Sequence, residues 1–176
     1  MTAMTDHIPV IETGRLRLRA PKLDDLPALT AFFATERSKL VGGPLDATDV
    51  NRAMMSIIGT WALRGHGFWH IADKASDRYL GATGILYAPG WDEPELGWNL
   101  IEEAEGRGIA FEAAQAARAY SASHLGRDAP ISYIDPANTR SIALALRLGA
   151  TFEREGELLG TPCHVYRHPS LCGVAA

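Results

Sequence analysis

Apolar and charged residues alternate over residues 15–20, a pattern that predicts a strand with one face in solvent. Leu16 and Leu18 lie on one face of this strand, and three arginines lie on the other. Two stretches of apolar residues at helical spacing follow, one after Asp24 and one after Thr48, and each of these side chains can cap a helix. The pattern therefore predicts a strand followed by two helices.

Strands and helices then alternate to the end of the chain. Turn residues separate three predicted strands over 68–73, 79–87 and 95–100. A helix from about residue 106 to 124 carries a stripe of small apolar residues, which permits close packing on a sheet. The remaining predicted elements are a strand over 131–134, a helix over 138–148, and closing strands over 152–158 and 163–168. This order predicts an α+β fold with one central sheet.

The composition is that of an ordinary globular chain. Its 176 residues are 47% hydrophobic and 22% charged, enough to bury a core, and we expect one domain over residues 1–176. No stretch approaches the roughly 20 apolar residues of a membrane span, and Met1–Pro9 lacks the regions of a signal peptide, so we expect a cytoplasmic protein without a membrane partner. The net charge of −4 argues against a nucleic-acid partner. Cys163 and Cys172 fit neither a zinc motif nor a disulfide framework.

Four histidines invite a metal interpretation, which their spacing does not support. His66 and His70, like His164 and His168, are four residues apart on predicted strands, where that spacing separates side chains by about 13 Å. No cysteine or carboxylate cluster completes either pair, so we expect no metal. His66 or His70 could instead line a substrate pocket, with ordinary surface placement as the alternative.

The most informative segment is a glycine-rich turn between the strand that ends at Leu100 and the next helix. Gly106 and Gly108 have no side chains to keep a phosphate from the backbone, and a helix N-terminus adds roughly half a positive charge there. Two glycines before a helix more often serve the geometry of the turn alone, so this signal is weak by itself. The glycine patterns typical of ATP and dinucleotide sites do not occur, which argues against those ligands.

Taken with its neighbours, this segment resembles the GNAT acetyltransferase superfamily. Residues 105–110, Glu-Gly-Arg-Gly-Ile-Ala, resemble its motif A, and residues 108–113 resemble the Gly-Tyr-Ala-x-Glu-Ala of the RimJ/RimL-like branch, which includes the ribosomal-protein N-terminal acetyltransferases. Residues 11–19 and 95–98 resemble the first and fourth strands of that branch, and 138–150 resemble its Asn-x-x-Ser…Leu-Gly-Phe signature. The resemblance runs in order over about residues 10–168, which is more specific than any one motif.

The resemblance implies the fold and the cofactor. It implies an α+β fold in α/β/α layers, with a mixed, mostly antiparallel central sheet of about seven strands, splayed fourth and fifth strands, and four helices. The pantetheine arm of acetyl-CoA would lie between the splayed strands, and the glycine-rich turn would hold its diphosphate. The residues implied in binding are Trp98, Asn99, Leu100, Gly106, Arg107, Gly108, Ile109, Ala110, Phe111, Asn138 and Ser141. For Asn138, a role as helix cap alone is an equal alternative.

One position departs from the motif where it matters for charge. Glu105 stands at the head of motif A, where the superfamily has a basic or amide residue. A carboxylate there would repel a diphosphate, so we expect it to point away. Arg107 is expected either to supply compensating charge or to be a solvated side chain.

The catalytic groups follow from position in the motif. Glu95, at the start of the splayed strand, is the first candidate for a general base, with a solvated strand-end charge as its alternative. Tyr133 occupies a position that supplies a base in many members, although a packing role is the alternative. Many members protonate the leaving thiolate with a tyrosine where this chain has Ala145, which leaves Ser141 as the nearest substitute.

The sequence therefore predicts an acetyl-CoA-dependent N-acetyltransferase that acts on a primary amine without a covalent enzyme intermediate. The acceptor is either a protein N-terminal α-amine or a small-molecule amine, and the loop over residues 39–46 is expected to border its site. The alternatives are a catalytically idle CoA-binding module and, more distantly, an enzyme that uses ATP. The sequence does not set the oligomeric state and leaves a homodimer open.

Overall fold

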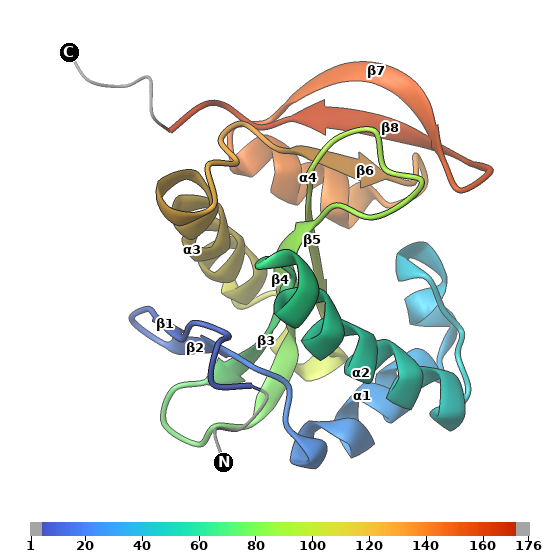
Figure 1. Cartoon of the computed structure of the whole chain (residues 1–176). Coiled ribbons are helices and arrows are strands. Elements are labelled where there is room, and N and C mark those ends of the chain that lie inside the picture. The colour runs from blue at the N-terminus through green and yellow to red at the C-terminus, as the bar shows by residue number, and fades with distance from the viewer. Residues whose placement is uncertain (1–4, 172–176) are drawn as a thin grey trace.

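The computed structural model describes residues 5–171 and arranges them around an eight-stranded sheet (Figure 1). The strands are β1 (Ile11–Glu12), β2 (Leu16–Arg19), β3 (Phe68–Asp73), β4 (Tyr79–Leu86), β5 (Glu95–Leu100), β6 (Ile131–Ile134), β7 (Thr151–Leu158) and β8 (Thr161–Arg167). Their order across the sheet is β1-β2-β3-β4-β5-β6-β8-β7. Seven of these strands were predicted, and the short β1 that pairs with β2 is the addition.

Four α-helices cover the sheet within the described residues. They are α1 (Leu26–Phe33), α2 (Ala47–Arg64), α3 (Ile109–His124) and α4 (Thr139–Arg147), joined by the 3-10 helices η1 (Leu23–Asp25), η2 (Glu36–Val41) and η3 (Glu102–Ala104). Figure 1 shows β2 to β5 between α3 on one side and α1 with α2 on the other, while α4 lies beside β6. The predicted layered α+β architecture is therefore confirmed. No helix among residues 5–171 is both long and apolar enough to cross a bilayer.

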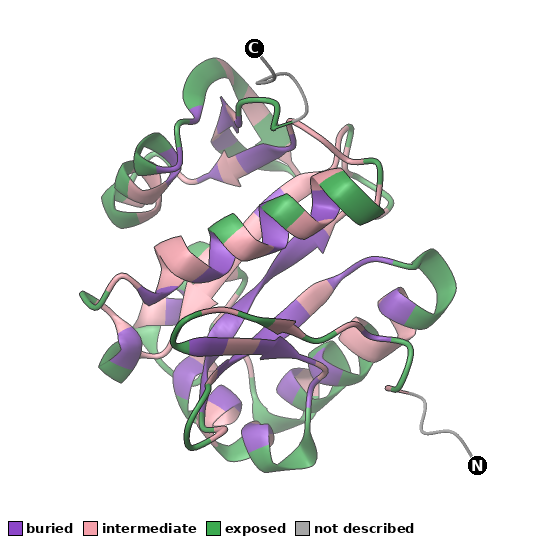
Figure 2. Ribbon diagram, turned by 90° about the vertical axis from the view of Figure 1, so that its left-hand side faces the viewer, coloured by how far each residue is buried: buried purple, intermediate pink, exposed green. Residues whose placement is uncertain are grey.

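The helix α3 packs closely on the sheet because its inner face is made of small residues. Ala113, Ala114 and Ala117 are fully buried, and Ile109 is 3% exposed. Small side chains let the helix axis approach the strands, and the helix lies across β4 and β5 (Figure 2). The N-terminus of α3 is thereby held at the end of β5, where the glycine-rich turn lies.

Two predicted helix starts shift by one or two residues. The helix α2 is capped by Asp46, whose carboxylate accepts a hydrogen bond from the Asp49 amide at 2.9 Å, so Thr48 is not the cap. The helix α1 follows the short turn η1, and Asp25 rather than Asp24 occupies its N-cap position. Asp25 makes no capping bond there because its carboxylate belongs to a buried polar cluster.

That cluster joins β2, η1 and β3 beneath the first helix. Arg19 donates two hydrogen bonds of 2.8 Å to the Asp25 carboxylate, and His70 Nδ1 lies 2.7 Å from the same group. All three side chains are buried. Burial alone would raise the pKa of Asp25, but the hydrogen bonds from Arg19 and His70 outweigh it and hold that pKa well below its usual range.

The cluster corrects the expectation for two histidines. His70 is completely buried against Asp25, and His66 is buried with its Nδ1 3.2 Å from the carbonyl oxygen of Ile85. Burial lowers the pKa of both imidazoles. Neither histidine lies on the surface or lines a substrate pocket; both belong to the interior of the sheet.

Asp25→Asn should destabilise the protein by about 3 kcal/mol, because it removes the buried one of the two carboxylates that pair with Arg19 and leaves only the partly exposed Asp77. The free energy of unfolding from urea titration measures this. Asp24→Asn, at the exposed neighbouring position, is the control and should change the value by less than about 0.5 kcal/mol. Equal effects of the two substitutions would contradict a structural role for the cluster.

Candidate functional site

The site lies where β5 and β6 separate. These two strands run parallel, and within residues 5–171 they are paired only at Glu95 and Ile131. Beyond that pair they diverge, as the green and orange strands in Figure 1 show. The edge of β5 that faces β6 is therefore left without a strand partner along Trp98, Asn99 and Leu100, since β4 pairs with the opposite edge.

Two cavities meet in this opening. One, of about 500 Å³, extends from Glu95 and Trp91 toward the turn between β7 and β8, and the other, of about 430 Å³, extends toward the N-terminus of α3. The residues that line both are Leu40, Val41, Trp98, Asn99, Asn138 and Ser141. Together the cavities form one continuous passage, which we call the cofactor cavity on the α3 side and the acceptor cavity on the Glu95 side.

The glycine-rich turn forms the far end of the cofactor cavity. Gly106 and Gly108 have φ values of +69° and +73°, left-handed conformations that other residues adopt only with strain. Gly108 is the N-cap of α3 and has no side chain to cap it. The first amides of α3 are thus left for a ligand, because the opening turn of a helix has no internal acceptors for them.

Two arginines neutralise the acidic residue at this end of the cavity. Glu105 accepts from Arg37 Nη2 at 2.7 Å and from Arg140 Nη1 at 2.5 Å. Arg37 comes from η2 and Arg140 from the start of α4, so the two ion pairs connect opposite walls of the cofactor cavity. All three side chains line that cavity. Sequence patterns do not identify these arginines as partners of Glu105, because both are far from it in the chain.

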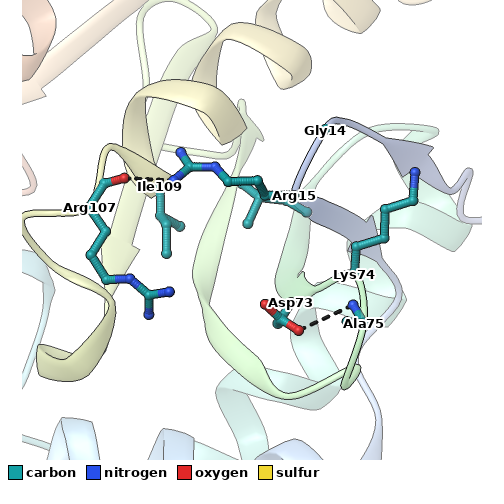
Figure 3. Close-up of a pocket in the computed structure, with 8 residues that line it drawn as sticks. Gly14, Arg15, Asp73, Lys74, Ala75, Arg107 and Ile109 are labelled. Atoms are coloured by element: carbon teal, nitrogen blue, oxygen red, sulfur yellow. Dashed lines mark hydrogen bonds between the residues drawn. The ribbon is translucent and has the colours of Figure 1, made fainter.

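Arg107 does not provide this compensation. Its side chain lines a separate pocket of about 390 Å³ with Gly14, Arg15 and Lys74 (Figure 3). Its carbonyl oxygen accepts a hydrogen bond of 3.0 Å from Arg15 Nη1. The expected role of Arg107 toward a phosphate is therefore confined to its backbone amide.

Glu95 lies half-buried in the wall of the acceptor cavity. Trp91 Nε1 donates a hydrogen bond of 2.6 Å to Oε2 of the carboxylate. Burial raises the pKa of Glu95 to about 7, and the Trp91 bond offsets only part of that effect. At neutral pH the group therefore holds and releases a proton with nearly equal ease, which suits proton transfer.

Asn138 and Ser141 lie at the junction of the cavities. Asn138 Oδ1 accepts from the Ser141 amide at 3.1 Å, so the side chain does cap α4 as the alternative interpretation held. The Ser141 hydroxyl accepts from Trp98 Nε1 at 3.3 Å, which brings β5 and α4 into contact across the opening. Asn138 also lines both cavities.

Two buried polar atoms in the opening lack a protein partner within residues 5–171. They are Oδ1 of Asn99 and the hydroxyl of Tyr133, both on cavity walls. Buried polar groups are normally hydrogen-bonded, so each is suited to a ligand. Ala145, in contrast, is fully buried in a cluster with Ile134 and Ala150, and its methyl side chain supplies no acid to the site.

A buried polar network, which the sequence did not reveal, fixes the base of the opening. The Ser132 hydroxyl lies 2.6 Å from the carbonyl oxygen of Leu96 and 3.0 Å from Nε2 of His168. Arg118 Nη1 lies 2.8 Å from the Leu148 carbonyl oxygen and 3.5 Å from Nδ1 of His168. The network thus connects β5, β6, the end of β8, α3 and the end of α4.

The hydrogen-bond partners in this network determine which of its atoms carry protons. The carbonyl oxygen of Leu96 can only accept, so Ser132 donates to it and accepts from Nε2–H of His168. Nδ1 of His168 is then unprotonated and faces Arg118. Burial, together with the charges of Arg118 and Arg167, lowers the pKa of His168 to about 4. His168 is therefore a neutral structural histidine, and no group of metal-binding side chains occurs among residues 5–171.

Comparisons with known proteins agree with this geometry. Residues 15–151 match the Acetyltransferase (GNAT) domain family. A crystal structure of an acetyltransferase from Agrobacterium tumefaciens is similar with 37% identity and a TM-score of 0.85, over 92% of this chain and 94% of that one. RimL, a ribosomal L7/L12 α-N-protein acetyltransferase in complex with coenzyme A, is similar in fold, with 19% identity and a TM-score of 0.76 over 92% and 98%. An uncharacterized N-acetyltransferase p20 from Bacillus licheniformis is 29% identical over 150 residues, 83% of each chain.

The network predicts how stability depends on pH. His168 has a pKa of about 4 in the fold and 6.5 when exposed, so the unfolded chain binds more protons between these values and stability falls as pH is lowered. Between pH 7 and pH 5, His168 should account for a loss of about 2 kcal/mol. His168→Gln, which can keep both hydrogen bonds but cannot be protonated, should remove that part of the loss. Identical pH dependence of the unfolding free energy in both proteins would contradict the assignment.

Proposed function

The chain belongs to the GNAT acetyltransferase family, and from this premise we propose that it transfers an acetyl group from acetyl-CoA to a primary amine in a ternary complex. One observation carries the proposal: an anion-binding helix N-terminus and a half-buried carboxylate lie at the two ends of one passage through the splayed strands. Ser141 is one of the residues that line both cavities, so ligands in the two can meet beside it.

The cofactor cavity fits a diphosphate attached to an extended amide-containing arm. The amides that follow Gly108 suit the diphosphate, and the Arg37 and Arg140 guanidiniums lie beside them. The unpaired edge of β5 suits an arm that carries its own amide groups, because such an arm can bond to the edge as another strand does. Oδ1 of Asn99, which lacks a protein partner, is a further acceptor for it.

The acceptor amine is activated from the other side. Acetyl-CoA supplies a thioester carbonyl, and an amine can attack it only after losing its proton. Oε1 of Glu95, the oxygen that Trp91 does not use, takes that proton directly or through water. An α-amine with a pKa near 8 is well matched to a carboxylate with a pKa of about 7, whereas a lysine amine near 10.4 is a poorer match.

Transfer then forms one bond and breaks another. The amine nitrogen bonds to the carbonyl carbon, the carbon–sulfur bond breaks, and the electron pair leaves on the CoA sulfur. A backbone amide of β5 stabilises the charge that collects on the carbonyl oxygen. The Ser141 hydroxyl, held by Trp98, is the nearest group that can protonate the thiolate, and a thiol with a pKa near 8.5 leaves without full protonation.

Glu95→Gln should lower the rate of acetyl transfer and, at high pH, raise the free energy of unfolding, because it removes a carboxylate whose ionisation destabilises the fold. Turnover with acetyl-CoA should fall roughly 100-fold or more, and the rise of kcat/KM with pH through about 7 should disappear. The raised pKa means that the folded state binds more protons between pH 4.5 and 7, so the wild-type protein loses stability as pH rises through this window. The variant should therefore be more stable at pH 8, on the order of 1–3 kcal/mol. Unchanged turnover would remove Glu95 as the base.

Gly108→Arg should disturb the cofactor end of the passage. The new side chain starts 3.6 Å from Arg15 Nη2 at a strained φ of +73°, so the turn should shift and displace the first amides of α3, and CoA affinity by titration calorimetry should fall roughly tenfold or more. Gly65→Arg is the control, because Gly65 has a similar φ of +69° at the end of α2 but lines neither cavity. Both variants should lose about 1–2 kcal/mol of stability from backbone strain, and only the first should lose affinity. Binding of CoA with no turnover on any amine would instead favour an idle CoA-binding module.

A further inference from the structure

The turn between β7 and β8 holds a leucine in a strained backbone conformation. Leu159 and Gly160 form a two-residue turn with φ values of +51° and +81°, between the paired residues Leu158 and Thr161. Turns with positive φ at both positions favour Asn-Gly, because asparagine tolerates the left-handed conformation and a branched apolar side chain does not. Strain that a fold retains points to a use for the side chain that causes it.

Leu159 uses that conformation to stand at the rim of the acceptor cavity. Its side chain is 69% exposed, yet it lines the cavity and contacts the loop that joins β4 to β5. A Cβ at Gly90 would lie 2.6 Å from Leu159 Cδ2, so the absence of a side chain at Gly90 is what admits the leucine. Leu40, on η2, is also exposed and lines the same cavity. In Figure 1 the β7–β8 turn and the α1–α2 segment lie on the same side of the molecule.

The walls between these two leucines carry little charge. The ionised side chains that line the acceptor cavity are Lys39, Glu95 and Asp135. Lys39 is paired with Glu36 outside it, and Asp135 accepts from the Ala137 amide at 2.7 Å. Thr161 is the polar residue beside the turn, and five further lining side chains are apolar, namely Phe68, Leu86, Trp91, Leu158 and Pro162. Glu95 and Asp135 are therefore the two carboxylates among the described lining residues, and Asp135 already accepts from a backbone amide.

We propose that the acceptor is a primary monoamine attached to an apolar or aromatic group, and that Leu159 contacts that group. This inference rests on the proposed transferase function. The amine pairs with Glu95, while the apolar group displaces water from the walls and from the exposed face of Leu159. A second ammonium, as in polyamines and aminoglycosides, would lose its water at mostly apolar walls, where the one other carboxylate, Asp135, is already engaged by the Ala137 amide. The same chemistry occurs in free arylalkylamines and in an α-amine that follows an apolar first residue of a peptide.

An acceptor panel tests the substrate class. Release of CoA thiol is measured with phenylethylamine, a peptide that begins with phenylalanine, a peptide that begins with serine, spermidine and kanamycin. The proposal expects kcat/KM for one or both phenyl-bearing amines to exceed that for spermidine and kanamycin by at least roughly tenfold. The free amine and the phenylalanine peptide separate the two sources of this chemistry. Faster turnover of the polycations, or of the serine peptide, overturns the proposed class but keeps the transferase function, whereas no turnover with any amine overturns both.

Leu159→Asn tests the residue itself. Asparagine suits the left-handed turn, so the melting temperature should rise, while KM for the preferred monoamine should increase roughly three- to tenfold. Ala129→Asn is the matched control, because Ala129 has a similar φ of +54° and lines neither cavity. It should relieve strain in the same way and leave the kinetics unchanged. A Leu159→Asn variant with a raised melting temperature and an unchanged KM would show that the strained leucine does not contact the acceptor.

Discussion

The site depends on the parallel strands β5 and β6, which pair at a single position among the described residues. Glu95 and Ile131 are partners, and the next residues of β5 and β6 turn away from each other. Without other contacts the two strands would tend to pair further, because the free N–H and C=O groups of a strand edge readily bond to another strand. Here the Ser132 hydroxyl donates to the Leu96 carbonyl oxygen, which a backbone amide would otherwise bind. His168 positions this serine through Nε2, and Arg118 lies against Nδ1 of the same histidine. The opening is thus built by polar side chains and is not left over from imperfect pairing.

Charge within the opening is balanced locally and not by the protein as a whole. The chain carries a net charge of −4, and it has a glutamate where the family favours a cation, yet Arg37 and Arg140 surround that glutamate. At the other end a single carboxylate is kept near the point of half-ionisation by the apolar groups around it. The two ends of the passage therefore differ in charge: arginines outnumber the glutamate at the α3 end, and a carboxylate lies at the other.

Local patterns in the sequence predict most of the helices and strands, but they do not predict contacts between residues that are far apart in the chain. The small-residue stripe of α3 and the glycines before it could be identified because both signals lie within one short segment. The burial of His70 could not be predicted, because it depends on a contact with Asp25, which is 45 residues away in the chain. The prediction that Arg107 compensates the charge of Glu105 was wrong for the same reason. Arg107 is close in sequence, but Arg37 and Arg140 are the residues that lie beside Glu105 in space. The roles of Glu95, Tyr133 and Ser141 in catalysis stay predictions.

The tight environment of Ala145 has a consequence for how this protein could change over time. A bulky phenol at that position would have to fit where Ala150, Ile134 and Tyr166 already touch a methyl group, and overfilled interiors force neighbouring backbone to move. The tyrosine common in related enzymes is therefore not one mutation away, since several packing partners would have to shrink together. A larger side chain at this position therefore requires coordinated changes in the residues packed around it.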